Sequence, residues 1–375
     1  MNLTAIRRQV RAVDDFLRPS RAEDRSIPVL DGGLSPNDAL DGFTPLWAET
    51  GSEPDDVVAV GHWVLVSADS RIHVVDPNSG AVASTHTFDA PVGAMATDGK
   101  TTVYVCQISA PVQRLTVRTD GTLSVGETVG GVLSCPTDAA LIGGRLFVSE
   151  GSQVHGPDEW RRDLMTKGHS GRVVEVTLAD SASPPRVVFD GLAWAGGIEV
   201  DSTDSTSLLV TETWRHRVVR GPIEGGPVVQ VGALLPGYPA RLAAGPGSEV
   251  LVSFLSLRTH LVEFVLREDE YRAEMVNTID PEYWISPTLR LDGERWEPLQ
   301  IGSMKHLNVT KPWAPPRAYG LVARMESDGT FTGSWHARVG SPRSGVTGVT
   351  VSGSRLVVAC RGGRLVLTSD GEFQA

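Results

Sequence analysis

Residues 56–67 read Asp56-Val-Val-Ala-Val-Gly-His-Trp-Val-Leu-Val-Ser67, and residues 71–76 continue with Arg71-Ile-His-Val-Val-Asp76. The stretch holds three short apolar runs separated by tight polar turns. Runs rich in Val, Ile and Leu between Gly, Asp and Ser turns are typical of antiparallel β-strands. The stretch therefore predicts a small sheet of at least three strands.

The same phrase recurs five more times. Each copy has a short strand, a turn, a second strand that ends in small or polar residues, and a third strand after a Gly-Arg or similar pair. Most copies are spaced by about 40 to 60 residues, which suits the blades of a propeller. One sheet cannot bury both of its faces alone, so neighbouring repeats must stack around an axis. The later copies begin near Val92, Thr137, Gly197, Arg241 and Gly348.

We therefore predict an all-β fold, a six-bladed β-propeller with short helical insertions over one face. The alternative is a large β-sandwich or two small β-domains, but the repeat runs through the chain without a linker. We place the propeller at residues 41–375 and an arm with one short helix at residues 1–40. The early stretch Phe43-Thr-Pro-Leu-Trp is expected to pair with the last strand and close the ring.

Two insertions interrupt the repeat, at about residues 153–169 in the third blade and 256–317 in the fifth. Pro157-Asp158-Glu159 favours the first turn of a short helix in the first insertion. The second insertion opens with a helical stretch near Thr259 to Val276. Both insertions follow a second strand, so both should rise from the same face. Long loops of this kind often form lids or binding walls. The second insertion also contains Trp284, Trp296 and Trp313.

Composition limits the classes of partner. The net charge of the 375 residues is −11 with no block of like charge, so neither nucleic acid nor an anionic membrane surface is expected as a partner. No apolar run approaches the roughly 20 residues that cross a bilayer. The N-terminal stretch lacks the apolar core of a secretion signal. Cys106, Cys135 and Cys360 are odd in number and widely spaced, which favours a reduced, cytoplasmic setting. The oligomeric state stays open.

Four segments, taken in order and spacing, resemble the strictosidine synthase-like propellers, which are related to the gluconolactonase-like propellers. The resemblance extends over about residues 50 to 370 and implies a small-molecule substrate in the central channel. The four segments are Ser170-Gly-Arg-Val-Val-Glu-Val, Asp190-Gly-Leu-Ala-Trp-Ala-Gly-Gly-Ile-Glu-Val, Leu208-Leu-Val-Thr-Glu-Thr-Trp-Arg-His-Arg-Val and Leu235-Pro-Gly-Tyr-Pro.

Metal-dependent lactonases and arylesterases of the wider group hold a calcium-like ion in the channel, and the resemblance marks the ligand positions. Hard cations need several oxygen ligands, yet Gly196 and Arg241 stand where the family has Asn, and Ala240 stands where it has an acid. Thr137 replaces a further Asn, and Asp55 takes the place of a Glu. We therefore expect neither a metal site nor a cofactor.

The arginine at this position suggests a replacement for the ion. A guanidinium stays charged in a protein, so a cation beside Arg241 would be strongly disfavoured. Our hypothesis is that Arg241 replaces the metal and pairs with Asp55 or Asp138. The alternative is that Arg241 turns outward.

Acid–base candidates lie on the face that carries the insertions. Glu150 and Glu212 end the second strands of blades three and four. Under a lid, such a carboxyl is expected to have a raised pKa suited to proton transfer, whereas a structural hydrogen-bond hub is the alternative. His155 and His169 flank the short helix and are candidate proton shuttles.

Other residues are candidates for substrate binding. Four aromatic side chains are expected to form a wall of the site or to pack between blades. Polar contacts are expected from charged residues of the inner strands. These candidates are Trp160, Trp194, Trp214 and Tyr238, together with Arg241, Asp55, Asp138 and Glu199.

Three functions remain open. The first is a metal-independent enzyme that promotes condensation, cyclisation or elimination on an apolar substrate by positioning and acid–base help. The family's synthases use a carboxylate in the last blade, but the matching stretch Ser341-Pro-Arg-Ser-Gly-Val-Thr-Gly-Val holds none. The second is a hydrolase of lactones or esters that uses a residual metal site or an activated water. The third is a propeller that binds a ligand or a protein without catalysis.

Overall fold

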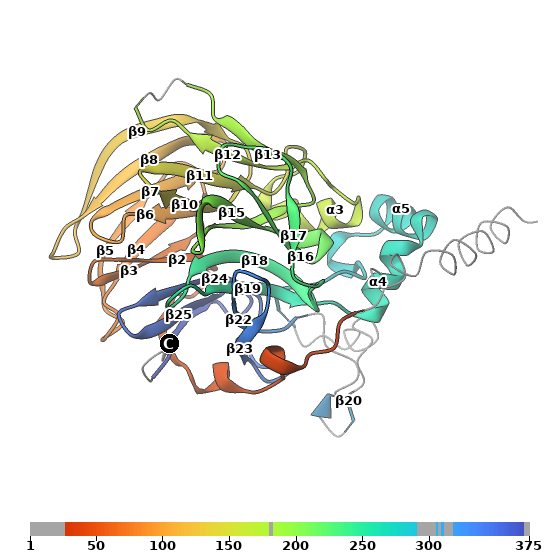
Figure 1. The fold of residues 1–375 in the computed structure, drawn as a ribbon. Coiled ribbons are helices and arrows are strands. Elements are labelled where there is room, and N and C mark those ends of the chain that lie inside the picture. The colour runs from red at the N-terminus through yellow and green to blue at the C-terminus, as the bar shows by residue number, and fades with distance from the viewer. Residues whose placement is uncertain (1–26, 180–182, 291–304, 307–308, 311–317, 371–375) are drawn as a thin grey trace, which may run out of the picture.

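The computed structural model describes residues 27–179, 183–290, 305–306, 309–310 and 318–370. Six four-stranded antiparallel sheets surround a central axis (Figure 1). The predicted six-bladed β-propeller is therefore confirmed. Residues 1–26 of the predicted arm lie outside the described residues, so its short helix stays a prediction, and Trp296 and Trp313 also lie outside them.

Each blade runs from the axis outward in chain order. Blade one holds β2 (Pro54–Val60), β3 (Trp63–Ala68), β4 (Arg71–Val75) and β5 (Val82–Thr87). Blade two holds β6 (Val92–Thr97), β7 (Thr102–Gln107), β8 (Ala110–Val117) and β9 (Leu123–Leu133). Blade three holds β10 (Pro136–Ile142), β11 (Arg145–Glu150), β12 (Gly171–Val176) and β13 (Arg186–Leu192).

The remaining blades follow the same plan with two variations. Blade four holds β14 (Ala195–Asp201), β15 (Asp204–Glu212), β16 (Arg217–Pro222) and β17 (Val229–Val231). Blade five holds β18 (Gly237–Ala244), β19 (Val250–Leu257), β22 (Leu321–Met325) and β23 (Phe331–His336), with the long insertion between its second and third strands. Blade six holds β24 (Val346–Ser352), β25 (Arg355–Cys360), β26 (Leu365–Thr368) and, from the other end of the chain, β1 (Thr44–Ala48).

The ring closes as predicted from the early strand. β1 pairs antiparallel with β26, with Thr44 opposite Thr368 and Ala48 opposite Leu365. The six inner strands, β2, β6, β10, β14, β18 and β24, contact one another in an unbroken circle. Because closure leaves each inner strand with a neighbour on both sides, the starts of all six strands surround one channel mouth.

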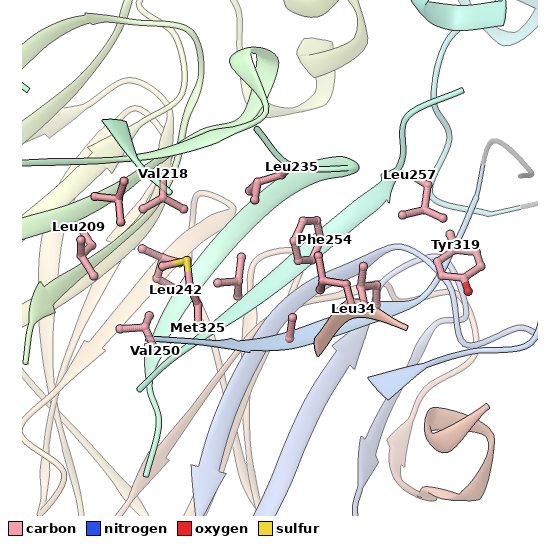
Figure 2. Close-up of a cluster of buried hydrophobic side chains, with 14 residues drawn as sticks. Leu34, Leu209, Val218, Leu235, Leu242, Val250, Phe254, Leu257, Tyr319 and Met325 are labelled. Atoms are coloured by element: carbon pink, nitrogen blue, oxygen red, sulfur yellow. The ribbon is translucent and has the colours of Figure 1, made fainter. Parts of the chain in front are cut away.

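Apolar side chains fill the spaces between neighbouring blades. Figure 2 shows one such cluster, where Leu209 and Val218 of blade four meet Leu242, Val250 and Phe254 of blade five. Equivalent clusters join the other pairs of neighbours, including blades six and one. This burial is the main force that holds the blades in a ring.

The described part of the arm docks on blade five. It contains two short 3₁₀ turns, η1 (Gly32–Leu34) and η2 (Ala39–Gly42). Asn37 donates from Nδ2 to the Ser334 carbonyl at 3.0 Å and accepts from the His336 amide at 3.0 Å. These two bonds continue the edge of β23 and fix the arm there.

Both insertions rise from the same face, as predicted. The first forms η3 (Pro157–Glu159) and α3 (Trp160–Met165), so the expected helix start at Pro157 is confirmed. The second forms α4 (His260–Arg267), α5 (Asp269–Thr278), η5 (Pro281–Tyr283) and the two-residue strands β20 (Lys305–His306) and β21 (Val309–Thr310). The single helical stretch predicted near 259–276 is two helices, because the chain leaves the helical conformation at Glu268.

The two insertions pack against each other. Leu164 and Met165 of α3 share an apolar cluster with Val262, Met275 and Trp284, and Figure 1 places α3, α4 and α5 together. Within the described ranges, no helix combines the length and apolarity needed to cross a membrane.

Candidate functional site

The channel mouth on the insertion-bearing face holds a cavity of about 190 Å³. All six blades contribute to its wall. The first insertion adds Pro157, Asp158 and Trp160, and the second adds Leu289. Four of the twelve residues predicted to form the site line this cavity. They are Asp55, Trp160, Trp194 and Arg241.

Arg241 reaches from blade five across the channel. Its Nη1 donates to the carbonyls of Asp55 and Thr347, both at 2.9 Å, and its Nη2 donates to the Gly93 carbonyl at 2.6 Å. Nη2 also pairs with the Asp55 carboxylate. Because these acceptors belong to the inner strands of blades one, two and six, the guanidinium joins four blades. The predicted Arg241–Asp55 pair is present, and the side chain does not turn outward.

The charges around Arg241 are unequal in their effects. Burial works to raise the pKa of Asp55, but Arg241 and Arg361 outweigh it and hold that pKa below its ordinary value. Burial raises the pKa of Asp56, and the negative charge of Asp55 raises it further. The pKa of Arg241 is raised: burial opposes its charge, but the nearby aspartates more than compensate. Of the two aspartates paired with Arg241, Asp55 is therefore the one that stays ionised.

Asp138 does not form the predicted pair with Arg241; it binds main-chain amides of neighbouring blades instead. Its Oδ2 accepts hydrogen bonds from the amides of Ile198 at 2.9 Å and Leu242 at 3.1 Å, which tie blade three to blades four and five. Asp56 makes a matching bond to the Met95 amide at 2.9 Å. Burial raises the pKa of Asp138 well above its ordinary value. Both aspartates thus join inner strands behind the cavity.

A second arginine extends the charge network toward solvent. Arg361 donates from Nη1 to Asp55 and from Nε to Glu53, each at 3.2 Å. Its Nη2 lies 3.8 Å from Asp158 Oδ1 on the first insertion. The cavity therefore has a ladder of alternating charges that runs from Arg241 in the channel to Asp158 at the rim.

The side chains at this position do not fit a divalent ion. Three carbonyl oxygens and the Asp55 carboxylate surround the spot, as they would surround a hard cation, but the Arg241 guanidinium fills it. A Cβ on residue 196 would lie 2.3 Å from Thr213 Oγ1, so an amide ligand there would require the Thr213 side chain to move. In the described part of the chain, no three His, Cys, Asp or Glu side chains gather as a metal site.

The four predicted aromatic residues form one cluster. Trp214 lies at its centre, with ring centroids 5.1 Å from Trp194 and 6.2 Å from both Trp160 and Tyr238. Trp160 and Trp194 face the cavity, whereas Trp214 and Tyr238 pack behind them. Aromatic rings at such separations attract one another, so Trp214 and Tyr238 support the two tryptophans that face the cavity.

Trp194 is held in an unusual backbone conformation. Its φ is +58° and its side chain covers Gly151, where a Cβ would lie 2.6 Å from the indole. A bulky residue with positive φ is strained, and such strain concentrates at functional sites. Glycine at position 151 gives the indole room beside the cavity.

Glu150 and Glu212 act as hydrogen-bond hubs in the structure. Both are fully buried. Glu150 accepts from the Ser134 amide at 2.6 Å and from Arg172 at 2.6 Å. Glu212 accepts from the Ala193 amide at 3.0 Å and pairs with two arginines, Arg215 and Arg217. Neither glutamate lines the cavity, so their contacts favour the structural alternative over catalysis.

The remaining predicted residues lie away from the cavity. His155 bonds through Nδ1 to Asp163 at 3.0 Å, and Asp163 also accepts from Trp214 Nε1 at 2.8 Å. This pair fixes the first insertion over the aromatic cluster. His169 is exposed at a separate pocket. Glu199 accepts from the Val200 amide at 2.8 Å, while Arg241 has Asp55 and Asp56 as its carboxylate neighbours.

Sequence reasoning missed several residues of the wall. In four blades the residue directly after the second strand, or one beyond it, lines the cavity. The repeat itself carried this signal, because the equivalent position could be read from each copy. Two hydroxyls of the wall, Thr213 Oγ1 and Thr347 Oγ1, are buried without a hydrogen-bond partner among the described residues. The four residues are Asp69, Ile108, Thr213 and Arg361.

The fold is shared with known propellers. A calcium-binding protein, regucalcin, from Agrobacterium tumefaciens has a TM-score of 0.53 at 11% identity, with 88% of this chain and 94% of that chain covered. A gluconolactonase from Xanthomonas campestris has a TM-score of 0.50 at 11% identity, with 87% and 88% covered. No protein-family model and no curated protein matches the sequence. The chain is thus structurally similar to regucalcin and gluconolactonase propellers, and the finer resemblance to strictosidine synthase-like propellers stays a prediction.

Proposed function

We propose that this protein is a metal-independent enzyme that binds a small, partly apolar substrate in the mouth of the central channel. The observation that carries the proposal is the Arg241 guanidinium, which takes the position of a cation while it holds Asp55 ionised at the cavity wall. Charged groups with perturbed pKa values in a cleft are typical of active sites. The indoles of Trp160 and Trp194 supply the apolar wall.

The chemistry that suits this wall passes through a positively charged intermediate. When an amine condenses with an aldehyde and loses water, an iminium cation forms, and a neighbouring nucleophile can close a ring on it. Asp55 would stabilise the cation electrostatically and accept the proton that ring closure releases. Aromatic faces stabilise cations as well. Arg241 and Arg361 would position Asp55 without touching the reacting atoms.

A hydrolase of lactones or esters is the second candidate. The fold likeness to a gluconolactonase favours it. So does Arg361, which lines the cavity and whose Nη2 has, among the described residues, a single 3.8 Å contact with exposed Asp158. A guanidinium at that place can stabilise the oxyanion that forms when water adds to a carbonyl.

A substrate panel with a chelator present tests the proposal. The panel contains arylethylamines with aldehydes, and separately lactones and aryl esters. We expect turnover of one class that EDTA leaves unchanged. Turnover of the amine and aldehyde class supports the first candidate, and turnover of the lactone and ester class supports the second. Activity that EDTA abolishes and calcium restores would contradict a metal-independent enzyme, and on lactones or esters it would indicate a hydrolase with a residual metal site. A ligand that binds without turnover would indicate a non-catalytic propeller.

Trp160→Ala provides a variant that should separate binding from chemistry. Trp160 is half-buried at the rim and stacks on Trp214, so its removal leaves the propeller core intact. We expect KM for the best panel substrate to rise about tenfold. This corresponds to the loss of about 1.4 kcal/mol of binding free energy from one aromatic contact. The kcat should change little. A fall in kcat with unchanged KM would show that Trp160 is not a binding wall.

A further inference from the structure

A second pocket of about 850 Å³ lies beside the aromatic cluster, between the first insertion and α4. Its wall combines Lys167 and His169 of the first insertion with Trp214, Arg215 and Arg217 of blade four. We call it the lateral pocket. Its size falls within the usual range for small-molecule sites, roughly 300 to 1,000 Å³.

The lateral pocket is positive on a protein whose net charge is −11. Of its five charged wall residues, four are cations. Arg258 and Glu263 neutralise each other through two contacts of 3.1 Å. Lys167 is paired as well, because its Nζ donates to Asp269 at 2.7 Å. Arg215 and Arg217 share a single carboxylate, that of Glu212, and so leave a net positive charge on the pocket. A concave surface of one sign concentrates ligands of the opposite sign.

The two arginines are held in place from behind. Glu212 is fully buried, and one of its carboxylate oxygens accepts a hydrogen bond from Nη1 of Arg215. The other oxygen contacts Nε and Nη2 of Arg217. Within the described part of the chain, Nε and Nη2 of Arg215 and Nη1 of Arg217 make no hydrogen bond. The side chains are 46% and 26% exposed. Glu212 thus orients the guanidinium groups and leaves donors for a ligand.

The deep wall is apolar and contains a buried imidazole. Leu164 and Leu266 lie beside the Trp214 ring. The His216 side chain is 8% exposed, and its Nδ1 has no partner at hydrogen-bonding geometry among the described residues, although the Gly237 main chain is close.

We propose that the lateral pocket is a second binding site, for an organic anion that joins a carboxylate or phosphate to an apolar body. The oxyanion would contact Arg215 and Arg217, because charge-assisted hydrogen bonds to guanidinium groups are strong, and the Lys167 ammonium, which Asp269 also contacts, would add to the attraction. The apolar body would pack on Trp214. The central cavity differs in sign, since its wall carries Glu53, Asp55, Asp69 and Asp158 against two arginines.

Calorimetric titration of the full chain tests the proposal with three probes of one shape. Naphthyl phosphate and naphthoate distinguish the two oxyanions, and neutral naphthalenemethanol controls for apolar contact. We expect at least one anion to bind, and the neutral compound to bind at least about tenfold more weakly. Equal binding of all three, or no binding of either anion, would overturn the proposal.

Charge variants locate the bound anion. Lys167 and its partner Asp269 are both at least half exposed, so the loss of their pair should cost little stability. Lys167→Glu should therefore fold normally and weaken binding about tenfold or more. Arg215→Gln, which can still donate to Glu212, should act in the same direction. Exposed Lys100 lies in another part of the propeller, and Lys100→Glu should have no effect. If Lys100→Glu weakens binding equally, or Arg361→Gln in the central cavity abolishes it while Lys167→Glu does not, the anion binds elsewhere.

Discussion

Arg241→Met should lower the free energy of unfolding by about 3–5 kcal/mol, the cost of removing one partner from a buried charge cluster. Methionine fills much of the same volume but offers no donor. Three strand carbonyls, those of Asp55, Gly93 and Thr347, lose their hydrogen bonds to Arg241, and Asp55 loses its closest cation. These lost hydrogen bonds are the ones that join four blades at the channel.

Denaturant unfolding of the variant and the wild type measures this difference. Arg338→Met is the matched control, because Arg338 is 74% exposed and pairs with Asp38 at the surface, so it should cost less than about 1 kcal/mol. Equal losses in the two variants would show that Arg241 is not a structural centre of the channel.

The same comparison should depend on pH. Burial already raises the pKa values of Asp56 and Asp138 in the presence of Arg241. Without Arg241 the folded chain would hold protons that the unfolded chain releases, so stability would fall as pH rises. The deficit of Arg241→Met should therefore be largest near about pH 8 and shrink toward about pH 5. Asp55 has the opposite sign in the wild type: its pairing stabilises above the ordinary carboxyl range and is lost as pH falls through its lowered pKa.

Asp55→Asn should lower kcat by about 10²–10⁴-fold, the usual contribution of a positioned acid–base group. Asparagine keeps the shape of the side chain but removes the charge that would stabilise a cationic intermediate. This expectation rests on the proposed function and uses the best substrate of the panel. The KM should change far less than kcat, because the apolar wall that binds the substrate is intact.

Asp69→Asn provides the comparison for this loss. Asp69 also lines the cavity, but it is exposed at the rim. We expect its replacement to change kcat less than about tenfold. Unfolding curves of both variants separate lost chemistry from lost structure. If Asp69→Asn abolished turnover and Asp55→Asn did not, the assignment of Asp55 would be wrong.

The ring could be predicted from the sequence because the same order of strands and turns recurs in all six repeats. Closure by Thr44–Ala48 and the shared face of the two insertions followed from position within the repeat. The Arg241–Asp55 pair was also predictable, since a buried guanidinium needs an acid. The place of Arg361 directly after a second strand could be read from the repeat, but its pairing with Asp55, 306 residues away in the chain, depends on the closed ring.

Contacts between distant segments also decided the tasks of Glu150 and Glu212. Their place at the ends of second strands suits either a catalytic acid or a hub. Only the fold shows that the loop before the inner strand of the same blade directs an amide at each glutamate, from Ser134 to Glu150 and from Ala193 to Glu212. The aromatic cluster could be predicted as a group, but the division into Trp160 and Trp194 at the cavity and Trp214 and Tyr238 behind it depends on how the first insertion folds.

Metal content tests most directly whether a built-in guanidinium takes the cation's place in the channel. The purified full chain is incubated with calcium, desalted and analysed by elemental mass spectrometry, with Arg241→Met measured beside it. The position of Arg241 among the channel carbonyls predicts far less than one divalent ion per chain of the wild type. One tightly held divalent ion per wild-type chain would contradict this account.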